Sequence, residues 1–315
     1  MKKKERKVAV VGAGSVGTTY VYALMHTGLA NEIVLIDLDE KLVEGEVMDL
    51  SHGLPFIPPV SVKKGDNSDL CDAELIVITA GAKQKPGQSR MELINKNAEI
   101  VDSICGEIKK CETEAVIVMV TNPVDTLTQL ALERLDLPAG RIIGSGTVLD
   151  TARLRYMLSS HCNVDARNVH AYVMGEHGDS EVTPWSMSRI GGMSINRYCE
   201  ICGRCKPQES HKEIAERVRD SAYHIIDYKG STFYGIGLSL VRISGAILRD
   251  EKSVLTVSTM LNGEYNIKDT CLSVPCIVGS EGVENIIAGQ LTDDEQAALL
   301  KSAEKLHEIY ENIKV

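Results

Sequence analysis

The sequence predicts an α/β protein with a Rossmann-type, doubly wound parallel sheet, followed by a second α+β domain. Short strand candidates rich in Val and Ile alternate with helical stretches through the first half of the chain. A Gly-x-Gly-x-x-Gly run, residues 12–17, directly follows the first strand candidate. The 315 residues are 43% hydrophobic, enough to fill a sizeable core.

The strand candidates are apolar on both faces, as strands in a covered parallel sheet are. They span residues 7–11, 33–37, 75–79, 116–121 and 141–143. Helices are predicted between them over residues 15–27, 41–50, 90–109 and 124–135. The second half, from residue 148, is predicted to mix helices with shorter strands. It ends in a helix over 292–313, whose Thr-Asp-Asp-Glu start provides a cap and acidic residues that suit the helix dipole.

Composition excludes several classes of partner. A net charge of −10, from 44 acidic and 34 basic residues, argues against nucleic acid and against an anionic membrane surface. No apolar run is long enough to cross a bilayer, and the basic opening leads straight into a strand rather than a signal peptide. The nine cysteines are scattered, which predicts reduced thiols and a cytoplasmic location.

The glycine run predicts a dinucleotide site. Gly12, Gly14 and Gly17 allow a tight turn and a close approach of the backbone to a pyrophosphate. Asp37 ends the second strand, where a carboxylate accepts hydrogen bonds from an adenosine ribose. The same carboxylate would repel a 2′-phosphate, so NAD is favoured over NADP. A flavin dinucleotide shares the fingerprint, and a glycine turn beside a surface Asp is the simplest alternative.

Two later loops lie at the carboxyl edge of the predicted sheet, where open α/β sheets bind ligands. The polar loop 79–90 can close over a substrate, bring Arg90 to it and expel water; an ordinary solvated loop is the alternative. Asn122, before Pro123, is predicted to hydrogen-bond the nicotinamide end or the substrate, although a turn Asn before Pro is common.

Three residues carry the predicted chemistry. Asp150 and Arg153 are three positions apart, and His177 follows in a Gly-Glu-His-Gly-Asp run. A guanidinium can hold a small carboxylate with two parallel hydrogen bonds, and an imidazole backed by a carboxylate can move one proton. The set suits a 2-keto or 2-hydroxy acid. A helix-capping pair and an unrelated buried histidine form the alternative.

Six ordered motifs together resemble the lactate and malate dehydrogenase family, and within it the bacterial L-lactate dehydrogenases, over essentially the full chain. They lie at residues 12–17, 36–40, 80–87, 121–125, 149–153 and 175–179. The resemblance implies an NAD-binding domain over 1–147 and a catalytic domain over 148–315. It also implies reversible hydride transfer between NADH and pyruvate, giving (S)-lactate, as the last step of lactic fermentation. A catalytically silent NAD-binding or sensor protein on the same fold is an alternative, which the intact Asp150, Arg153 and His177 argue against.

The resemblance also implies residue roles. His177 would be the proton donor and acceptor, Asp150 would orient its ring, and Arg153 would clamp the substrate carboxylate. Arg90 would polarise the carbonyl and stabilise the developing alkoxide. Asn122 and Thr232 would line the substrate pocket. The residues implied to hold the cofactor are Gly12, Gly14, Val16, Gly17, Asp37, Gly81, Ala82, Asn122 and Ile236.

Substrate choice depends on position 84. Malate enzymes of the family carry an arginine there that pairs with the second carboxylate of oxaloacetate, whereas this chain has Gln84. Loss of one charge-assisted hydrogen bond is worth roughly 1.5–3 kcal/mol, about ten- to more than a hundredfold in specificity. Pyruvate is therefore predicted. A dehydrogenase for bulkier acids such as hydroxyisocaproate stays open, because a glutamine does not fix pocket size.

Arg155 and His170 match positions that bind phosphate in bacterial lactate dehydrogenases activated by fructose 1,6-bisphosphate. The resemblance thus implies a homotetramer in which the bisphosphate bridges these basic groups across a symmetry axis. The alternative is a solvated helix arginine and a strand-end histidine.

The cysteines at positions 199, 202 and 205 have no place in the resemblance. Their spacing can suit zinc or part of an iron–sulfur site, but a fourth ligand is not obvious and nothing in the sequence shows that the ligands converge. Three thiols on a loop or helix are the simpler interpretation, and no metal is predicted.

Overall fold

The computed structural model describes residues 6–83, 87–202 and 207–315. Its first half contains β1 (Lys7–Val11), α1 (Ser15–Met25), β2 (Glu32–Ile36), α2 (Glu40–His52), η1 (Leu54–Phe56), β3 (Ser61–Lys64), η2 (Asn67–Leu70), β4 (Leu75–Ile78), α3 (Arg90–Lys109), β5 (Val116–Met119), α4 (Val124–Arg134), η3 (Ala139–Arg141) and β6 (Ile142–Gly144). Its second half contains α5 (Val148–Cys162), η4 (Ala166–Asn168), β7 (Val169–His170), η5 (Trp185–Met187), β8 (Arg189–Ile190), β9 (Met193–Ser194), α6 (Ile195–Cys202), α7 (Pro207–Lys229), α8 (Tyr234–Leu248), β10 (Ser253–Asn262), η6 (Glu264–Asn266), β11 (Lys268–Gly279), β12 (Gly282–Ile286) and α9 (Asp293–Glu311).

One nine-stranded sheet runs through the molecule in the order β12-β11-β10-β6-β5-β4-β1-β2-β3. The six strands from β6 to β3 pair in parallel, which confirms the predicted doubly wound parallel sheet. The antiparallel strands β10, β11 and β12 extend it, joined to β6 where Ser258 pairs with Gly144. The sheet therefore continues across the predicted boundary at residues 147–148.

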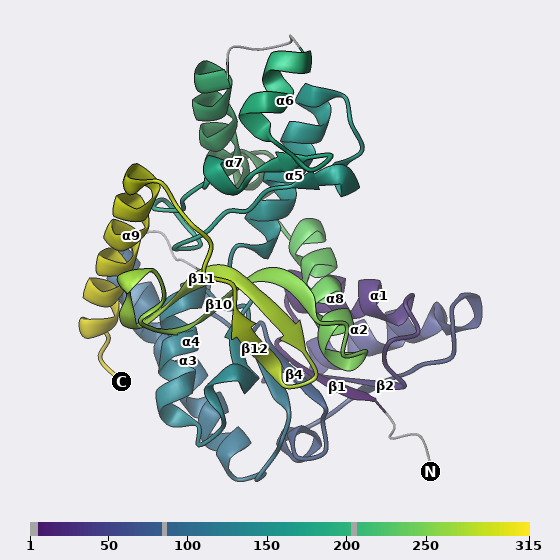
Figure 1. Cartoon of the computed structure of the whole chain (residues 1–315). Coiled ribbons are helices and arrows are strands. Elements are labelled where there is room, and N and C mark those ends of the chain that lie inside the picture. The colour runs from purple at the N-terminus through teal and green to yellow at the C-terminus, as the bar shows by residue number, and fades with distance from the viewer. Residues whose placement is uncertain (1–5, 84–86, 203–206) are drawn as a thin grey trace.

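The central strands are buried on both faces, as their apolar sequences predict. Alternate residues of β1 belong to different core clusters, with Val8 and Val10 in one and Ala9 and Val11 in the other. Helices α1 and α8 contribute to the first cluster, and α3 and α4 to the second (Figure 1). The result is a three-layer α/β arrangement.

Helices α5, α6 and α7 form a lobe at the top of Figure 1, next to the small sheet β7-β8-β9. The lobe has its own cluster of buried residues, among them Leu154, Ile195 and Val218. The loop that contains His177 runs between β7 and β8, and its Gly175 pairs with Ser273 of β11 in the large sheet. The lobe and the large sheet thus meet around the predicted catalytic segment.

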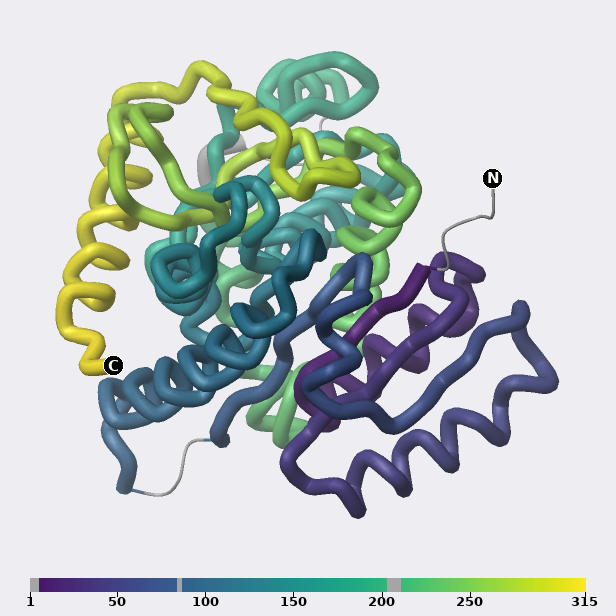
Figure 2. Tube along the Cα trace, turned by 90° about the horizontal axis from the view of Figure 1, so that it is seen from below, coloured from purple at the N-terminus to yellow at the C-terminus, as the bar shows by residue number. Residues whose placement is uncertain are grey.

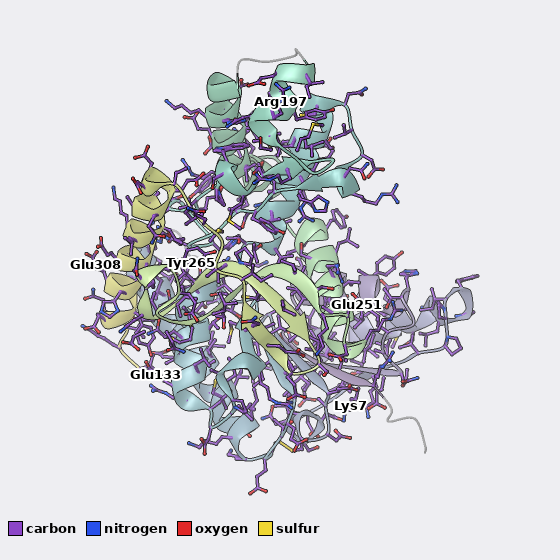
Figure 3. The ribbon with its side chains drawn as sticks, viewed as in Figure 1. Lys7, Glu133, Arg197, Glu251, Tyr265 and Glu308 are labelled. Carbon is purple, nitrogen blue, oxygen red and sulfur yellow. A yellow bond between two sulfur atoms is a disulfide. The ribbon has the colours of Figure 1, made fainter. Side chains whose placement is uncertain are left out.

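The last helix closes the molecule on one side. Thr292 caps α9 by accepting a hydrogen bond from Glu295 N, as its sequence predicts. Tyr265 lies beside α9 in Figure 3, and its carbonyl accepts a hydrogen bond from the Gln296 side chain. The C-terminus ends next to α3 (Figure 2), where Lys314 N donates to Asn95 Oδ1 at 3.3 Å. None of the described helices is long and apolar enough to cross a membrane.

Two predictions about strands were wrong. β3 was not predicted, because its Ser-Val-Lys-Lys sequence is polar, as suits a strand at the edge of the sheet. The strands of the second half were predicted to be shorter, yet β10 has 10 residues and β11 has 12. They pair directly as an antiparallel hairpin, which needs no crossover helix, so both strands can run long.

The prediction of reduced thiols was wrong for one pair, because Cys71 and Cys111 form a disulfide. Cys71 follows η2 and Cys111 follows the last turn of α3, and the fold brings their Cα atoms to 4.5 Å. They are 40 residues apart in sequence, so no local spacing pattern points to the pair.

Candidate active site

The glycine run forms the tight turn that its sequence predicts. A Cβ on Gly17 would lie 1.9 Å from the carbonyl oxygen of Gly12, and one on Gly12 would lie 2.5 Å from Ala80 N. Gly12 also has a φ of +115°, which only glycine adopts readily. A Cβ on Gly14 would meet no atom within 4 Å, so the N-terminus of α1 is open. This arrangement leaves room for a pyrophosphate at a helix start.

Asp37 lies beside this turn. Its Oδ2 accepts a hydrogen bond of 2.7 Å from Ala13 N, and its Oδ1 accepts one from Asp39 N. Asp37 lines a cavity of about 980 Å³ together with Gly12, Gly81 and Ala82. Four of the predicted cofactor residues therefore share one cavity, whose size and carboxylate fit a dinucleotide such as NAD.

The far walls of this nucleotide cavity were not predicted. Residues from η2 and its preceding turn form one wall and residues from α3 form the other: Asp66, Asn67, Asp69 and Leu70, and Glu99, Ile100, Ser103, Ile104 and Glu107. The four-residue spacing of Ile100 and Ile104 puts both on one helix face. That spacing shows an apolar face but not what the face contacts, so sequence alone could not assign it.

Asn97, from the middle of α3, links the loops that follow β4 and β5. Its Oδ1 accepts a hydrogen bond from Ala82 N, and its Nδ2 donates to Asn122 O, both at 2.8 Å. The backbone of Asn122 is therefore fixed, while its side chain remains exposed. Ala82 and Asn122, both predicted to contact the cofactor, are joined by one side chain.

Asp150 joins the two other predicted catalytic residues. Its Oδ2 lies 2.6 Å from His177 Nδ1, and its Oδ1 accepts a hydrogen bond of 2.5 Å from Arg153. Asp150 is buried in the first turn of α5, and its side chain is 3% exposed, against 27% for His177 and 12% for Arg153. A carboxylate, an imidazole and a guanidinium thus meet at a site that is only partly open to solvent.

A second carboxylate contacts the backbone of His177. The buried side chain of Asp125, on the first turn of α4, accepts a hydrogen bond of 2.8 Å from His177 N. Burial raises the pKa of Asp125 to about 6, and the hydrogen bond from the His177 backbone opposes that rise. Asp125 belongs to the Asn-Pro-Val-Asp motif, which is the sequence signal that could have marked it.

The ionisation of the pair depends on both partners. Burial lowers the pKa of His177, but the charge of Asp150 and the hydrogen bond to it outweigh burial and raise the pKa to about 9. Burial acts against the Asp150 carboxylate as well. The charges of His177 and Arg153 overcome it and keep the pKa of Asp150 below its usual range. The site therefore favours a carboxylate beside a protonated imidazole.

Glu181, four residues after His177, is an acidic group that sequence reasoning missed. The residue is 8% exposed, and its Oε1 is buried with no hydrogen-bond partner among the described residues. Burial raises its pKa to about 8, and repulsion from Asp150 adds to the rise. His177, Arg219 and Arg153 attract its charge and oppose the shift. Its position in the same loop as His177 was the available signal.

Arg90 reaches the same loop from the first turn of α3. Ser89 and Glu92 form a capping box at the start of that helix. The Arg90 side chain is 62% exposed, and its guanidinium lies 3.8 Å from carboxylate oxygens of Glu176 and Asp179. These residues flank His177, so the structure brings Arg90 to the catalytic segment.

Three predicted site residues remain. Val16 on α1 and Ile236 on α8 pack against the same core cluster, on one side of the sheet. Thr232 is half-buried in the loop before α8. Gln84 lies outside the described residues.

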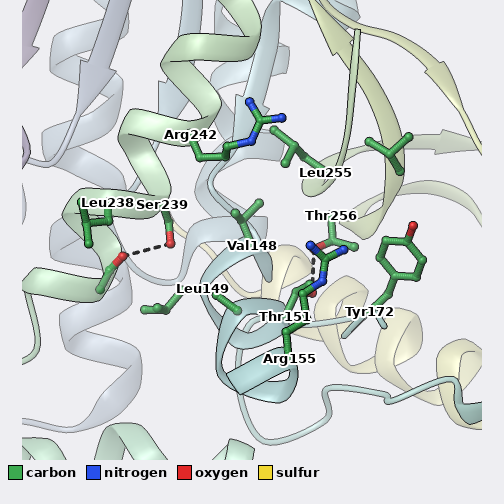
Figure 4. A pocket seen from close by; sticks show the side chains of 13 residues that line it. Val148, Leu149, Thr151, Arg155, Tyr172, Leu238, Ser239, Arg242, Leu255 and Thr256 are labelled. Atoms are coloured by element: carbon green, nitrogen blue, oxygen red, sulfur yellow. Dashed lines mark hydrogen bonds between the residues drawn. The ribbon is translucent and has the colours of Figure 1, made fainter. Parts of the chain in front are cut away.

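The two predicted phosphate-binding residues, Arg155 and His170, do not line the same cavity. Arg155 lines a cavity of about 400 Å³ (Figure 4), and its guanidinium lies 5.7 Å from the centre of the Tyr172 ring. It also donates a hydrogen bond to Ala171 O. Arg242 of α8, which was not predicted, lines the same cavity. Burial lowers the pKa of Arg155, and the charge of Arg242 adds to that effect. His170 is exposed on β7 and is not among the described residues that line the cavity.

The cysteine cluster has no metal-binding geometry in the described part of the chain. Cys199 is buried and Cys202 is half-buried at the end of α6, whereas Cys205 lies outside the described residues. No group of three or more His, Cys, Asp or Glu side chains among residues 6–83, 87–202 and 207–315 could hold a metal ion.

Comparison with known proteins adds independent evidence. Residues 6–144 match the lactate/malate dehydrogenase, NAD binding domain, and residues 147–315 match the lactate/malate dehydrogenase, alpha/beta C-terminal domain. The chain is 52% identical to an L-lactate dehydrogenase of Treponema denticola, over 98% of this chain and 99% of that protein. It is 50% identical to L-lactate dehydrogenase 1 of Clostridium acetobutylicum, over 99% of both chains.

Solved structures agree with this relationship. The minor L-lactate dehydrogenase of Enterococcus mundtii in its ligands-bound form has a TM-score of 0.97 at 42% identity, over 99% of this chain and 100% of that one. Its ligands-unbound form has a TM-score of 0.92, over 100% of this chain and 99% of that one. Since both domains match in order and the likeness covers nearly the whole chain, this chain belongs to the lactate/malate dehydrogenase family and has that family's NAD-binding domain.

Proposed function

We propose that this chain is an L-lactate dehydrogenase, which reduces pyruvate to (S)-lactate with NADH and catalyses the reverse reaction. The observation that carries the proposal is the position of Asp150, whose two oxygens contact His177 and Arg153 separately. A proton-transfer group and a carboxylate-binding group are thereby held beside each other. The names of the Treponema and Clostridium relatives support the same activity.

Each side chain has a defined task in this proposal. Arg153 binds the substrate carboxylate, because its guanidinium can form two parallel hydrogen bonds. His177 donates its proton to the carbonyl oxygen during reduction and accepts one from the hydroxyl during oxidation. Arg90, whose side chain is mostly exposed, moves onto the same oxygen and stabilises its developing negative charge. Asn122 and Thr232 complete the pocket.

NAD supplies the hydride when it is bound, and the protein supplies orientation, a proton and exclusion of water. Gly12, Gly14 and Gly17 accommodate the pyrophosphate, and Asp37 binds the adenosine ribose. Val16, Gly81, Ala82 and Ile236 hold the remainder, with Ile236 against the nicotinamide. Residues 1–147 form the NAD-binding domain and residues 148–315 the catalytic domain, in a cytoplasmic enzyme of lactic fermentation.

Gln84 sets the substrate. An uncharged side chain there favours the methyl group of pyruvate, whereas an arginine would pair with the second carboxylate of oxaloacetate. NADH oxidation with pyruvate, oxaloacetate and 2-ketoisocaproate in parallel tests the assignment. A preference for pyruvate that Gln84→Arg shifts toward oxaloacetate supports it. A preference for 2-ketoisocaproate would point to a dehydrogenase of bulkier acids, and no NADH oxidation would point to a sensor protein.

Regulation by fructose 1,6-bisphosphate is part of the proposal, with Arg155 and His170 as phosphate ligands in a homotetramer. The supporting observation is a cavity in which Arg155 and Arg242 repel one another, a repulsion that a phosphate would relieve. Activity with and without the bisphosphate tests it. Arg155→Gln should abolish the activation and leave basal turnover unchanged, and a retained activation would exclude this site.

A further inference from the structure

The Cys71–Cys111 disulfide joins two segments that line the nucleotide cavity. Cys71 directly follows η2, whose Asn67, Asp69 and Leu70 line one wall. Cys111 lies just beyond α3, whose last cavity-lining residue is Glu107. The disulfide therefore joins the two walls that sequence analysis did not anticipate.

Other contacts tie the same walls together. Cys111 Sγ lies 3.8 Å from the backbone oxygen of Asn67, and the Asn67 side chain contributes to lowering the pKa of Glu107. Leu70 is 1% exposed and belongs to the same buried cluster as Cys105 and Ile108 of α3. These contacts are noncovalent and can open and close. The disulfide is covalent, so it limits how far η2 and α3 can separate.

The position of the pair makes it accessible to small redox reagents. Cys71 is exposed and Cys111 is half-buried. By contrast, Cys105, six residues earlier and on α3, is buried, and burial raises the pKa of its thiol to about 12. A thiolate in solution can reach the disulfide sulfurs directly, whereas Cys105 has neither access nor thiolate character.

We propose that Cys71 and Cys111 are a reversible redox site that controls the affinity of the nucleotide cavity for NADH. In the oxidising direction the two thiols lose two protons and two electrons and form one S–S bond. A low-molecular-weight disulfide accepts them and becomes two thiols. In the reducing direction a dithiol attacks one sulfur, passes through a mixed disulfide and leaves as a cyclic disulfide, while both cysteines regain their protons.

The direction of the effect follows from the geometry. The cross-link confines η2 and α3 to the separation at which both line the cavity. Without the cross-link, η2 and α3 are separated in part of the protein molecules. The observed affinity for NADH then falls in proportion to the fraction of molecules that can still bind it. The dithiol form should bind NADH about three- to tenfold more weakly. Turnover at saturating NADH should not change, since Asp150 and His177 lie on other elements and Arg90 is at the opposite end of α3 from Cys111.

The test compares the two redox forms of the full-length protein. One sample is treated with oxidised glutathione and the other with dithiothreitol, and the reagents are removed. Thiol titration after unfolding should give two additional thiols per chain in the reduced sample, and peptide mass analysis should identify Cys71–Cys111 in the oxidised one. NADH binding is then measured by fluorescence titration. The expected result is a Kd that is about three- to tenfold higher for the reduced form.

Matched variants identify the cysteines responsible. Cys71→Ser and Cys111→Ser should both bind NADH with the Kd of the reduced form and should not respond to oxidant. Cys202→Ser is the control: this cysteine is at the distant end of α6, so the variant should respond like the unaltered protein. Equal Kd values in the two forms, a tighter reduced form or a response that persists in Cys71→Ser would overturn the proposal. Because the readout is NADH binding alone, it is independent of which 2-keto acid the enzyme reduces.

Discussion

At the scale of single residues, Asp150 performs two tasks because each of its oxygens has a different partner. Oδ2 lies against His177 Nδ1 and Oδ1 against Arg153, so the same carboxylate sets the charge of the imidazole and the direction of the guanidinium. Burial makes this arrangement costly unless the charges are paired. Removing the charge of Asp150 should therefore affect the proton donor far more than the cofactor site.

The first prediction concerns Asp150→Asn and the pH dependence of pyruvate reduction. Reduction needs protonated His177, whose pKa is raised to about 9, so activity should persist through neutral pH and fall as pH rises through about 9. In the variant, burial still lowers the His177 pKa but the attraction of Asp150 is gone, so this alkaline limb should move to lower pH. The turnover number should drop about 100-fold or more, while the NADH Kd stays within about twofold. Equal losses in turnover and in NADH affinity would contradict the assignment.

The second prediction concerns Glu181, whose pKa is raised to about 8. As pH rises through about 8, Glu181 ionises and its negative charge, which interacts with His177, helps to keep the imidazole protonated. Glu181→Gln should therefore leave kcat/KM for pyruvate unchanged below pH 7 and shift the alkaline limb to lower pH. A pH series from 6 to 10 on both proteins measures the shift. Glu181→Asp, which keeps the charge, is the control, and coincident alkaline limbs for the Glu181→Gln variant and the unaltered enzyme would exclude this role.

At the scale of elements, local sequence signals predicted a helix or strand correctly where that element is stabilised by its own residues. The predicted helix over residues 90–109 matches α3, Arg90–Lys109, whose start is stabilised locally by the capping box of Ser89 and Glu92. β3 was missed because an edge strand depends on its pairing with β2 more than on its own apolar content. The cavity wall formed by η2 was missed for the same reason, because its position depends on α3, which is distant in the sequence.

The third prediction tests a cap at this scale. Thr292 accepts a hydrogen bond from Glu295 N, and the Glu295 side chain accepts one from Thr292 N in return. Thr292→Ala should lower the free energy of unfolding by about 1 kcal/mol. Thr292→Ser keeps the hydroxyl and should retain most of that stability. Urea unfolding followed by circular dichroism gives both values, and an unchanged midpoint in the Ala variant would show that the cap contributes nothing.

At the scale of the whole molecule, the sequence motifs contain the residues of the candidate active site but do not show how the two halves join. Gly12, Asp37, Asp150, Arg153 and His177 all fall in motifs whose spacing is local. The pairing of β6 with β10 and the cavity shared by Arg155 and Arg242 depend instead on contacts between segments about 90 to 110 residues apart. Such contacts leave no periodic signal in a single sequence, so the continuous sheet and Arg242 could only be found in the fold.

Large apolar side chains are exposed on α1, α2 and α8, which are on the right of Figure 1, and on η1, which follows α2. They are Tyr22, Met48, Phe56, Tyr234 and Leu238, with exposed fractions of 58%, 57%, 87%, 67% and 65%. An apolar surface of this kind is typical of a protein–protein interface. It supports the proposed homotetramer, in which these helices would face a second copy of the chain.

The fourth prediction follows from that surface. Sedimentation equilibrium of the unaltered protein should give about four times the chain mass of 34.4 kDa. Met48→Glu places a charge in the apolar surface and should lower the measured mass, because an unpaired charge at an interface is costly to desolvate. Ile201→Glu, an equally exposed apolar site on α6 in the upper lobe, is the matched control and should keep the tetramer. Circular dichroism of both variants distinguishes dissociation from unfolding. A folded Met48→Glu protein that still sediments as four chains would exclude this surface as the interface, and a single-chain mass for the unaltered protein would exclude the tetramer itself.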